Sequence, residues 1–311
     1  MIRSQIITEI SSSPLLMRET ALKEVELIIA NMQNGKNATH NASAKIISTL
    51  KHRIYSQQSN QICCDEVDDD NDPFSSYAEN TVIIIPIIGC MFKYNTIDRN
   101  EWKYVTGMDT IANLIRKADA SPNIAGIILL CNTPGGTTQS IYQLEDALRN
   151  RTKPCIGLVD GQCCSGGIYS LSFCDKIYAT NRMCEIGSIG TFAKIMDDSK
   201  QDEMMGIKII SVYPPESSYK NLAIREALDG NPQKMIDESL SPFAIHFQNI
   251  IKTNRPKLDQ SAEGILEGRV FYAYDAITYK LIDGLMNMNQ TVELVLSMAQ
   301  QQKDIYSPFK K

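Results

Sequence analysis

The chain has 311 residues, of which 43% are hydrophobic and 22% are charged. This length allows one large domain or two smaller ones with a substantial core, and the composition excludes disordered, collagen-like and coiled-coil proteins. The formal net charge of -5 comes from 36 acidic and 31 basic residues, and six of the acidic residues lie in the single tract 65–72. The rest of the chain is near neutral and has no basic stripe, so nucleic acid is not an expected partner.

Metal sites, cofactors and membrane segments are also not expected. The nine cysteines are scattered without a C-x-x-C pair, which indicates reduced, buried thiols, and the three histidines lie far apart in sequence. The N-terminal residues lack a signal-peptide core, and no apolar run approaches the roughly 18 residues that a membrane helix needs. We therefore expect a cytoplasmic protein without a membrane anchor.

The first elements in chain order are helical patterns that predict a small N-terminal module, residues 1–56. Apolar residues at steps of three and four predict an amphipathic helix that ends near Gly35; they are Leu22, Val25, Ile29 and Met32. A second, weaker helical pattern covers residues 44–55. The polar and acidic residues 57–80 are predicted to form a solvated linker.

From residue 81 onward, short runs rich in Ile and Val alternate with helical segments. Strands are predicted at residues 81–88, 124–130, 154–159, 176–179 and 208–212, and helices at 108–120, 140–149, from 165 and at 233–252. Continuously apolar strands separated by helices predict an α/β fold with a parallel sheet covered on both faces. This main domain is expected to span residues 81–290, followed by a C-terminal helix and tail at 291–311.

Two glycine-rich turns follow apolar strands of the predicted sheet. They are Asn132-Thr-Pro-Gly-Gly136 and Gly161-Gln-Cys-Cys-Ser-Gly-Gly167. Because the carboxyl ends of adjacent parallel strands meet at one edge, the two turns are expected side by side. Glycine backbone N–H groups can form an oxyanion hole there, and Ser165 can present a nucleophilic hydroxyl. Each turn alone would more often be an ordinary turn or a helix N-cap, so their joint placement carries the prediction.

A serine nucleophile needs a base, and no histidine is well placed for that role. His40 and His52 belong to the N-terminal module, and His246 lies among apolar neighbours in a long helix, which favours a structural role. A lysine can act instead when burial removes its charge. The candidates after Ser165 are Lys194, Lys200, Lys208 and Lys220.

Seven short motifs follow one another in a recognisable order. They are Ile85-Pro-Ile-Ile-Gly89, Asn132-Thr-Pro-Gly-Gly136, Ser165-Gly-Gly167, Gly187-Ser-Ile-Gly190, Tyr219-Lys220, Gly268-Arg-Val-Phe271 and Leu281-Ile-Asp-Gly284. Their order and spacing over roughly residues 80–290 resemble the signal peptide peptidase and protease IV family of serine proteases. The resemblance implies the ClpP/crotonase fold, with stacked parallel βαβ units, and a Ser/Lys dyad that needs no cofactor.

Carried onto this chain, the resemblance makes Ser165 the nucleophile and Lys220 the general base. Ser188 matches the hydroxyl that helps to hold the lysine. The backbone amides of Gly135, Gly136 and Gly166 match the oxyanion hole.

The N-terminal segment points to one branch of the family. Ser13-Pro-Leu-Leu-Met-Arg18 and the following amphipathic helix are similar to the tailed-phage members that act in capsid maturation. This implies a phage or prophage product that cleaves capsid or scaffold proteins in the bacterial cytoplasm or an assembling prohead. The family resemblance itself implies a ring-like homo-oligomer in which neighbouring subunits can share the dyad. The chain departs from the family pattern at Cys163 and Cys164, where small residues are usual and cysteine is small enough to fit, and at Asn221, where aspartate commonly follows the lysine.

Two alternatives remain open. A pseudo-protease could retain the fold as a non-catalytic structural or scaffold-binding capsid assembly protein. A crotonase-type acyl-CoA hydratase or isomerase would share the fold and the glycine turns, but it would need acid/base carboxylates at those turns, and Asp160 is the nearest.

Overall fold

A computed structural model describes residues 15–17, 51–56, 61–66, 74–75, 77–98, 103–105 and 107–306 of the chain. The predicted helix at 22–35 lies outside these residues. In the strands β1 (Leu15–Met17), β2 (Lys51–Ser56), β3 (Gln61–Glu66), β5 (Thr96–Asp98) and β6 (Lys103–Val105), the description covers the backbone. Among the described helices, none combines the length and the apolar character that crossing a membrane requires.

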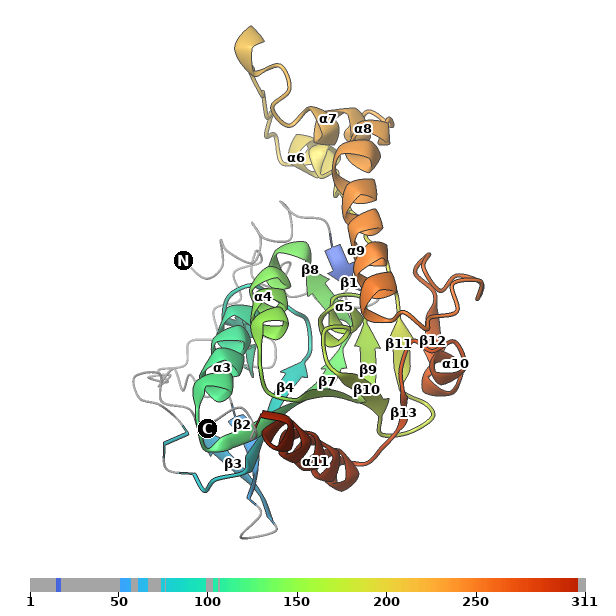
Figure 1. The fold of residues 1–311 in the computed structure, drawn as a ribbon. Coiled ribbons are helices and arrows are strands. Elements are labelled where there is room, and N and C mark those ends of the chain that lie inside the picture. Colours follow the sequence, from blue (N-terminus) through green and yellow to red (C-terminus); the bar gives the residue numbers. More distant parts are fainter. Residues whose placement is uncertain are drawn as a thin grey trace.

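A nine-stranded sheet forms the centre of the fold, with a main path in the order β12-β11-β9-β7-β4-β2-β3 (Figure 1). Its strands not yet given are β4 (Thr81–Ile88), β7 (Ile124–Thr133), β9 (Cys155–Cys164), β10 (Lys176–Ala179), β11 (Glu185–Gly187), β12 (Val270–Tyr272) and β13 (Gly284–Leu285). Strands β4, β7 and β9 are parallel neighbours. The first half of β9 pairs with β10 and its end pairs with β11, both in parallel. The predicted α/β class with a parallel sheet is confirmed.

Helices cover both faces of this sheet because its strands are apolar on both faces. Ile83, Ile85 and Ile87 of β4 join the larger core cluster, whereas Val82 and Ile84 join the smaller one. The larger cluster includes residues of α3 (Met108–Ala120), α4 (Tyr142–Asn150), α5 (Gly166–Leu171), α9 (Ser241–Asn254) and α10 (Ala273–Thr278). The smaller cluster is closed by α11 (Met288–Tyr306), which lies on the opposite side of the sheet (Figure 1).

Residues 51–56 and 61–66 form strands, where the sequence predicts the end of a helix and a linker. Strand β2 pairs antiparallel with β3 and with β4, so the hairpin extends the sheet past β4. The acidic residues Asp65 and Glu66 lie at register positions opposite His52 and Lys51. The sequence prediction weighed these acids only as a sign of solvation, whereas the structure places both in a strand.

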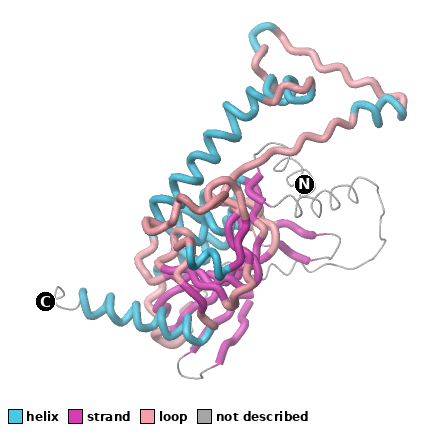
Figure 2. Tube along the Cα trace, turned by 90° about the vertical axis from the view of Figure 1, so that its right-hand side faces the viewer, coloured by secondary structure: helices cyan, strands magenta, loops and turns pink. Residues whose placement is uncertain are grey.

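Residues 191–240, here named the arm, project from the body of the molecule before α9 returns to it (Figures 1 and 2). The arm contains α6 (Ser199–Met204), a 3-10 turn (Pro215–Ser217), α7 (Leu222–Leu228), α8 (Gln233–Met235) and a π-helical turn (Ile236–Leu240) that leads into α9. The hydroxyl of Thr191 donates to the Leu240 carbonyl (3.1 Å), which joins the two ends. No residue of the arm is buried.

The predicted strand at residues 208–212 is wrong, because this segment of the arm has no regular secondary structure. Its side chains Ile209, Ile210 and Val212 are 71%, 71% and 84% exposed. A β-branched run has strand propensity, but a strand also needs a neighbour to pair with, and none of the described strands pairs with this segment.

Candidate active site

The two glycine-rich turns lie side by side, as the sequence predicts. Strand β7 is parallel to β9, with Thr133 opposite Cys163, and β9 leads through Ser165 into α5. A Cβ atom on Gly166 would lie 3.6 Å from the backbone nitrogen of Gly136, and one on Gly167 would lie 2.6 Å from the Thr133 methyl carbon. The small size of these glycines therefore brings the start of α5 against the turn that follows β7.

Ser165 occupies a strained turn between β9 and α5. Its φ and ψ are 52° and -114°, and the residue is 1% exposed. Its N–H donates to the Gly187 carbonyl (2.8 Å), and its carbonyl accepts from Tyr169 N–H (3.0 Å), so both neighbouring elements hold this conformation. A non-glycine residue at positive φ costs about 1–3 kcal/mol, and such strain clusters at functional sites. A strained strand-to-helix turn is also the geometry that presents the nucleophilic serine of α/β-hydrolases.

The three candidate oxyanion glycines differ in what their N–H groups do. Gly135 N–H donates to Thr133 Oγ1 (3.1 Å), so its amide serves to shape the turn. In β8 (Gly135–Thr137), the Gly135 carbonyl and Thr137 N–H both bond Met91. Because alternate residues of a strand direct their polar groups to opposite edges, Gly136 N–H faces the other edge. Gly166 is the first residue of α5 and has no acceptor within the helix. Gly136 and Gly166 are therefore the better donors.

Ser188 lies beside the Ser165 turn. It follows Gly187, which is opposite Cys164 in the parallel pairing of β11 with β9 and accepts the Ser165 N–H. Ser188 is half-buried with φ 55°, and its N–H donates to the Arg269 carbonyl (2.9 Å). The structure thus brings Ser165 and Ser188 together with the amides of Gly136 and Gly166.

Lys220 does not lie in this group. It is exposed on the arm, two residues before α7, and α7 is far from α5 (Figure 1). The other candidate bases, Lys194, Lys200 and Lys208, are also exposed on the arm. Within this chain, none of the four lysines has the buried environment that a neutral lysine needs.

Asp160, the carboxylate weighed for acyl-CoA chemistry, is exposed and accepts a hydrogen bond from Thr180 Oγ1 (3.0 Å). A second carboxylate does not stand with it in the described glycine turns. The turns therefore lack the acid/base pair that a hydratase would use.

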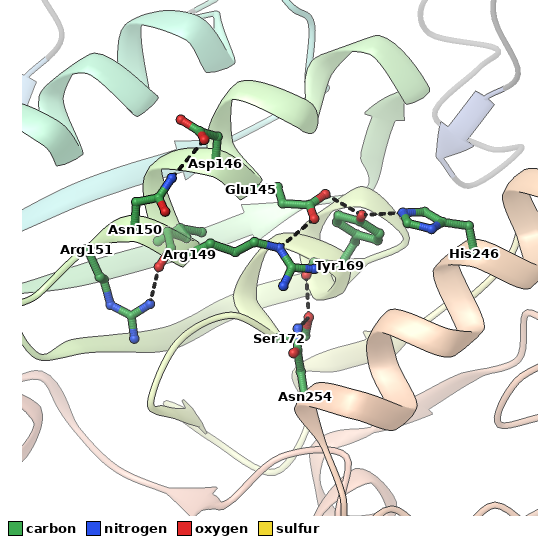
Figure 3. Close-up of polar contacts among 10 residues, drawn as sticks. Glu145, Asp146, Arg149, Asn150, Arg151, Tyr169, Ser172, His246 and Asn254 are labelled. Atoms are coloured by element: carbon green, nitrogen blue, oxygen red, sulfur yellow. Dashed lines mark hydrogen bonds and ion pairs between the residues drawn. The ribbon is translucent and has the colours of Figure 1, made fainter.

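A polar cluster behind the serine turn was not foreseen from the sequence (Figure 3). Tyr169 Oη donates to Glu145 Oε2 (2.6 Å) and lies 3.1 Å from His246 Nε2, while Arg149 Nε donates to Glu145 Oε1 (2.8 Å). Burial raises the pKa of Tyr169, and the Glu145 carboxylate raises it further, so the phenol stays protonated and donates. The cluster joins α5 to α4 and to α9, and it gives His246 the structural role that its sequence context favours.

Fold and site together define a class: an α/β protein with a serine on a strained strand-to-helix turn beside glycine amides, the arrangement of an acyl-transfer site. Residues 147–304 match the model of peptidase family S49. This chain belongs to peptidase family S49. The predicted resemblance to the signal peptide peptidase and protease IV family is thereby confirmed.

Individual relatives agree with this assignment. Protease 4 of Haemophilus influenzae is 24% identical over 228 residues, which cover 72% of this chain and 36% of that protein. Capsid assembly protease C of Escherichia phage lambda is 23% identical over 228 residues, covering 70% of this chain and 49% of that protein. The chain therefore matches between about a third and about a half of these relatives' length. A solved structure of a membrane-bound stomatin-specific protease aligns with a TM-score of 0.43 at 15% identity, covering 70% of this chain and 84% of that one.

Proposed function

We propose that this protein is a serine endopeptidase that hydrolyses peptide bonds through an acyl-enzyme on Ser165. The observation that carries the proposal is the strained backbone of Ser165, at φ 52° between a strand and a helix. The protein maintains this strain beside two amide donors, which is the combination that acyl transfer to a serine requires.

The proposed reaction uses groups of the chain and one water molecule. The neutral amine of Lys220 takes the proton of Ser165 Oγ, which attacks the carbonyl carbon of the scissile bond. The N–H groups of Gly136 and Gly166 stabilise the oxyanion, each by about 3 kcal/mol in the transition state. Lys220 then protonates the leaving amine, and it activates the water that hydrolyses the ester. Ser188 holds the lysine amine through its hydroxyl.

We propose further that Lys220 reaches the Ser165 site of a neighbouring subunit in a ring-like homo-oligomer. Two observations support this: the four candidate lysines lie on the arm, and the arm exposes many apolar side chains, of which Met196, Met204 and Val212 are 72%, 82% and 84% exposed. Exposed apolar surface of this extent marks an interaction site. Docking the arm on another copy would bury Lys220 and give it the dry environment that a lysine base needs.

The proposed substrates are capsid or scaffold proteins of a tailed phage, processed in the host cytoplasm or in the assembling prohead. Support comes from the similarity to Capsid assembly protease C of phage lambda and from the N-terminal segment noted in the sequence.

The test is covalent labelling with a small fluorophosphonate, whose phosphorus Ser165 Oγ attacks as fluoride leaves. We expect one adduct, located at Ser165 by peptide mass spectrometry, and a much slower reaction in Lys220→Ala. A folded oligomer that stays unlabelled, also after addition of capsid or scaffold chains, would instead support the alternative of a non-catalytic assembly protein. The exposed position of Lys220 within one chain is the observation that favours this alternative.

A further inference from the structure

Strand β8 carries the proposed oxyanion donor Gly136, and both of its edges are occupied. On one edge, Met91 N–H donates to the Gly135 carbonyl (2.9 Å) and Thr137 N–H donates to the Met91 carbonyl (3.1 Å). On the other edge lies β1, a segment of the same chain, which runs antiparallel to β8. These two strands form a small sheet of their own, separate from the central sheet.

The register of β1 places one carbonyl at the oxyanion donor. Leu15 is opposite Thr137, Leu16 is opposite Gly136 and Met17 is opposite Gly135. In an antiparallel pair, facing residues alternate between those that exchange two hydrogen bonds and those that exchange none. Because Thr137 N–H and the Gly135 carbonyl point to Met91, the bonded pair on the β1 side is Leu16 with Gly136. The Leu16 carbonyl is thus directed at Gly136 N–H.

A substrate peptide would need this same place. Its scissile carbonyl must reach Gly136 N–H, and an extended peptide that does so adds by strand pairing to the edge of β8 that β1 occupies. Ser165 is 1% exposed and Gly136 is buried, so some part of the protein must move before a substrate reaches either group. The pairing with β1 involves three residues on each strand, and a two-stranded pairing of this size is marginal in water.

We propose that Leu15–Met17 is a built-in substrate mimic, which occupies the peptide-binding edge of β8 until a protein substrate displaces it. The inference rests on the proposed function of Ser165 and Gly136. It also defines the substrate as an extended segment whose residue opposite Gly136 has a free N–H, which excludes proline at that position.

The proposal is tested in the full-length protein with Leu16→Pro. Proline at this position removes the N–H that bonds the Gly136 carbonyl, and it disfavours the pairing. Leu15→Pro is the matched control, because the N–H of Leu15 points away from β8. Each variant is treated with a tripeptidyl diphenyl phosphonate, which pairs with the β8 edge, and with the small fluorophosphonate, which reacts at Ser165 without a peptide to pair with that edge.

We expect Leu16→Pro to react about tenfold faster with the peptidyl probe. This factor corresponds to about 1.4 kcal/mol of free energy that the probe no longer spends on displacing β1 from β8. The small probe should react at one rate with the wild type and both variants, which also shows that the variants fold. An unchanged peptidyl rate in Leu16→Pro, with normal labelling by the small probe, would overturn the inference and leave the proposed function standing. If the small probe fails to label the wild type, the proposed function itself is wrong.

Discussion

Ser165 combines a buried hydroxyl with a backbone conformation that suits glycine better than serine. Ser165→Ala and Ser165→Gly both remove the nucleophile, so both should abolish turnover. They should differ in stability, because glycine adopts positive φ without a steric penalty. We expect Ser165→Gly to be more stable than Ser165→Ala by about 1 kcal/mol or more, roughly 2–4 °C in Tm. Thermal denaturation of the two variants checks this, and equal Tm values would contradict the strain at this turn.

Asp283 is a second residue whose environment has a measurable effect, here on how the stability of the fold depends on pH. It accepts Ile177 N–H (2.8 Å) and pairs with Arg255 Nη1 (2.9 Å), and Lys176 Nζ lies 3.5 Å away. Burial alone would raise the pKa of Asp283, but the hydrogen bonds from Arg255 and Ile177 and the two positive charges outweigh it, so the pKa lies below its ordinary 3.8. The ionised carboxylate therefore stabilises the fold above that value, and this stabilisation is lost as the pH falls through the folded pKa.

We accordingly expect Asp283→Asn to lower the free energy of unfolding at pH 7 by about 1–3 kcal/mol. The difference from the wild type should shrink below about pH 4, where the wild-type carboxylate is protonated first in the unfolded chain and then, at lower pH, in the folded protein. Urea unfolding at pH 7, 5 and 3 measures both effects. A difference that stays constant across this range would show that the charge of Asp283 does not stabilise the fold.

At the scale of elements, the loop before α7 is ordered around Lys220. The Arg225 guanidinium lies over the Tyr213 ring (4.4 Å), and its Nη2 donates to the carbonyls of Ser218 (2.8 Å) and Lys220 (3.4 Å). Asn221 adopts a left-handed conformation at φ 56° and begins the helix. Arg225 is therefore a positioning residue for the proposed base.

Arg225→Gln should lower kcat by about tenfold to a hundredfold, because a loosened loop misplaces the lysine, while KM changes little. Arg182→Gln, at an exposed arginine outside the arm, is the matched control and should keep wild-type kinetics. Steady-state kinetics on a peptide substrate separates the two parameters. A rise in KM alone in Arg225→Gln would show that this arginine contacts substrate rather than placing Lys220.

Helices and strands with strong local sequence signals could be predicted from the sequence, and the other elements could not. The bounds of β4 and α3 agree with the predicted 81–88 and 108–120, because apolar runs and helical periodicity are local signals. The terminal helix begins at Met288, before the predicted residue 291, and the predicted strand at residues 208–212 does not form. At the site, Ser165 and the glycine turns are local motifs on adjacent strands. The contacts of Tyr169 with Glu145 and His246 span 24 and 77 positions. They could not be predicted, because local patterns in the sequence do not indicate contacts between such distant residues.

At the scale of the whole molecule, the proposed sharing of the dyad leads to a mixing experiment. Ser165→Ala and Lys220→Ala chains should each be inactive, because each lacks one member of the dyad. Mixed oligomers should recover part of the activity, since a Lys220 from the first chain can serve a Ser165 from the second. The measurement is peptide hydrolysis after subunit exchange, with each variant alone as the control. Complete absence of recovery in verified mixed oligomers would place the dyad within one chain.

The separation of the arm from the serine turn also determines how activity depends on the amount of protein. If the base always arrives from another copy, an isolated subunit carries an attacking group that nothing deprotonates, and the rate at high dilution rises faster than the first power of concentration. Newly synthesised chains would then be harmless to the other proteins of the cell. Cleavage would begin only where the chains gather, so the place of assembly would decide which proteins are cut.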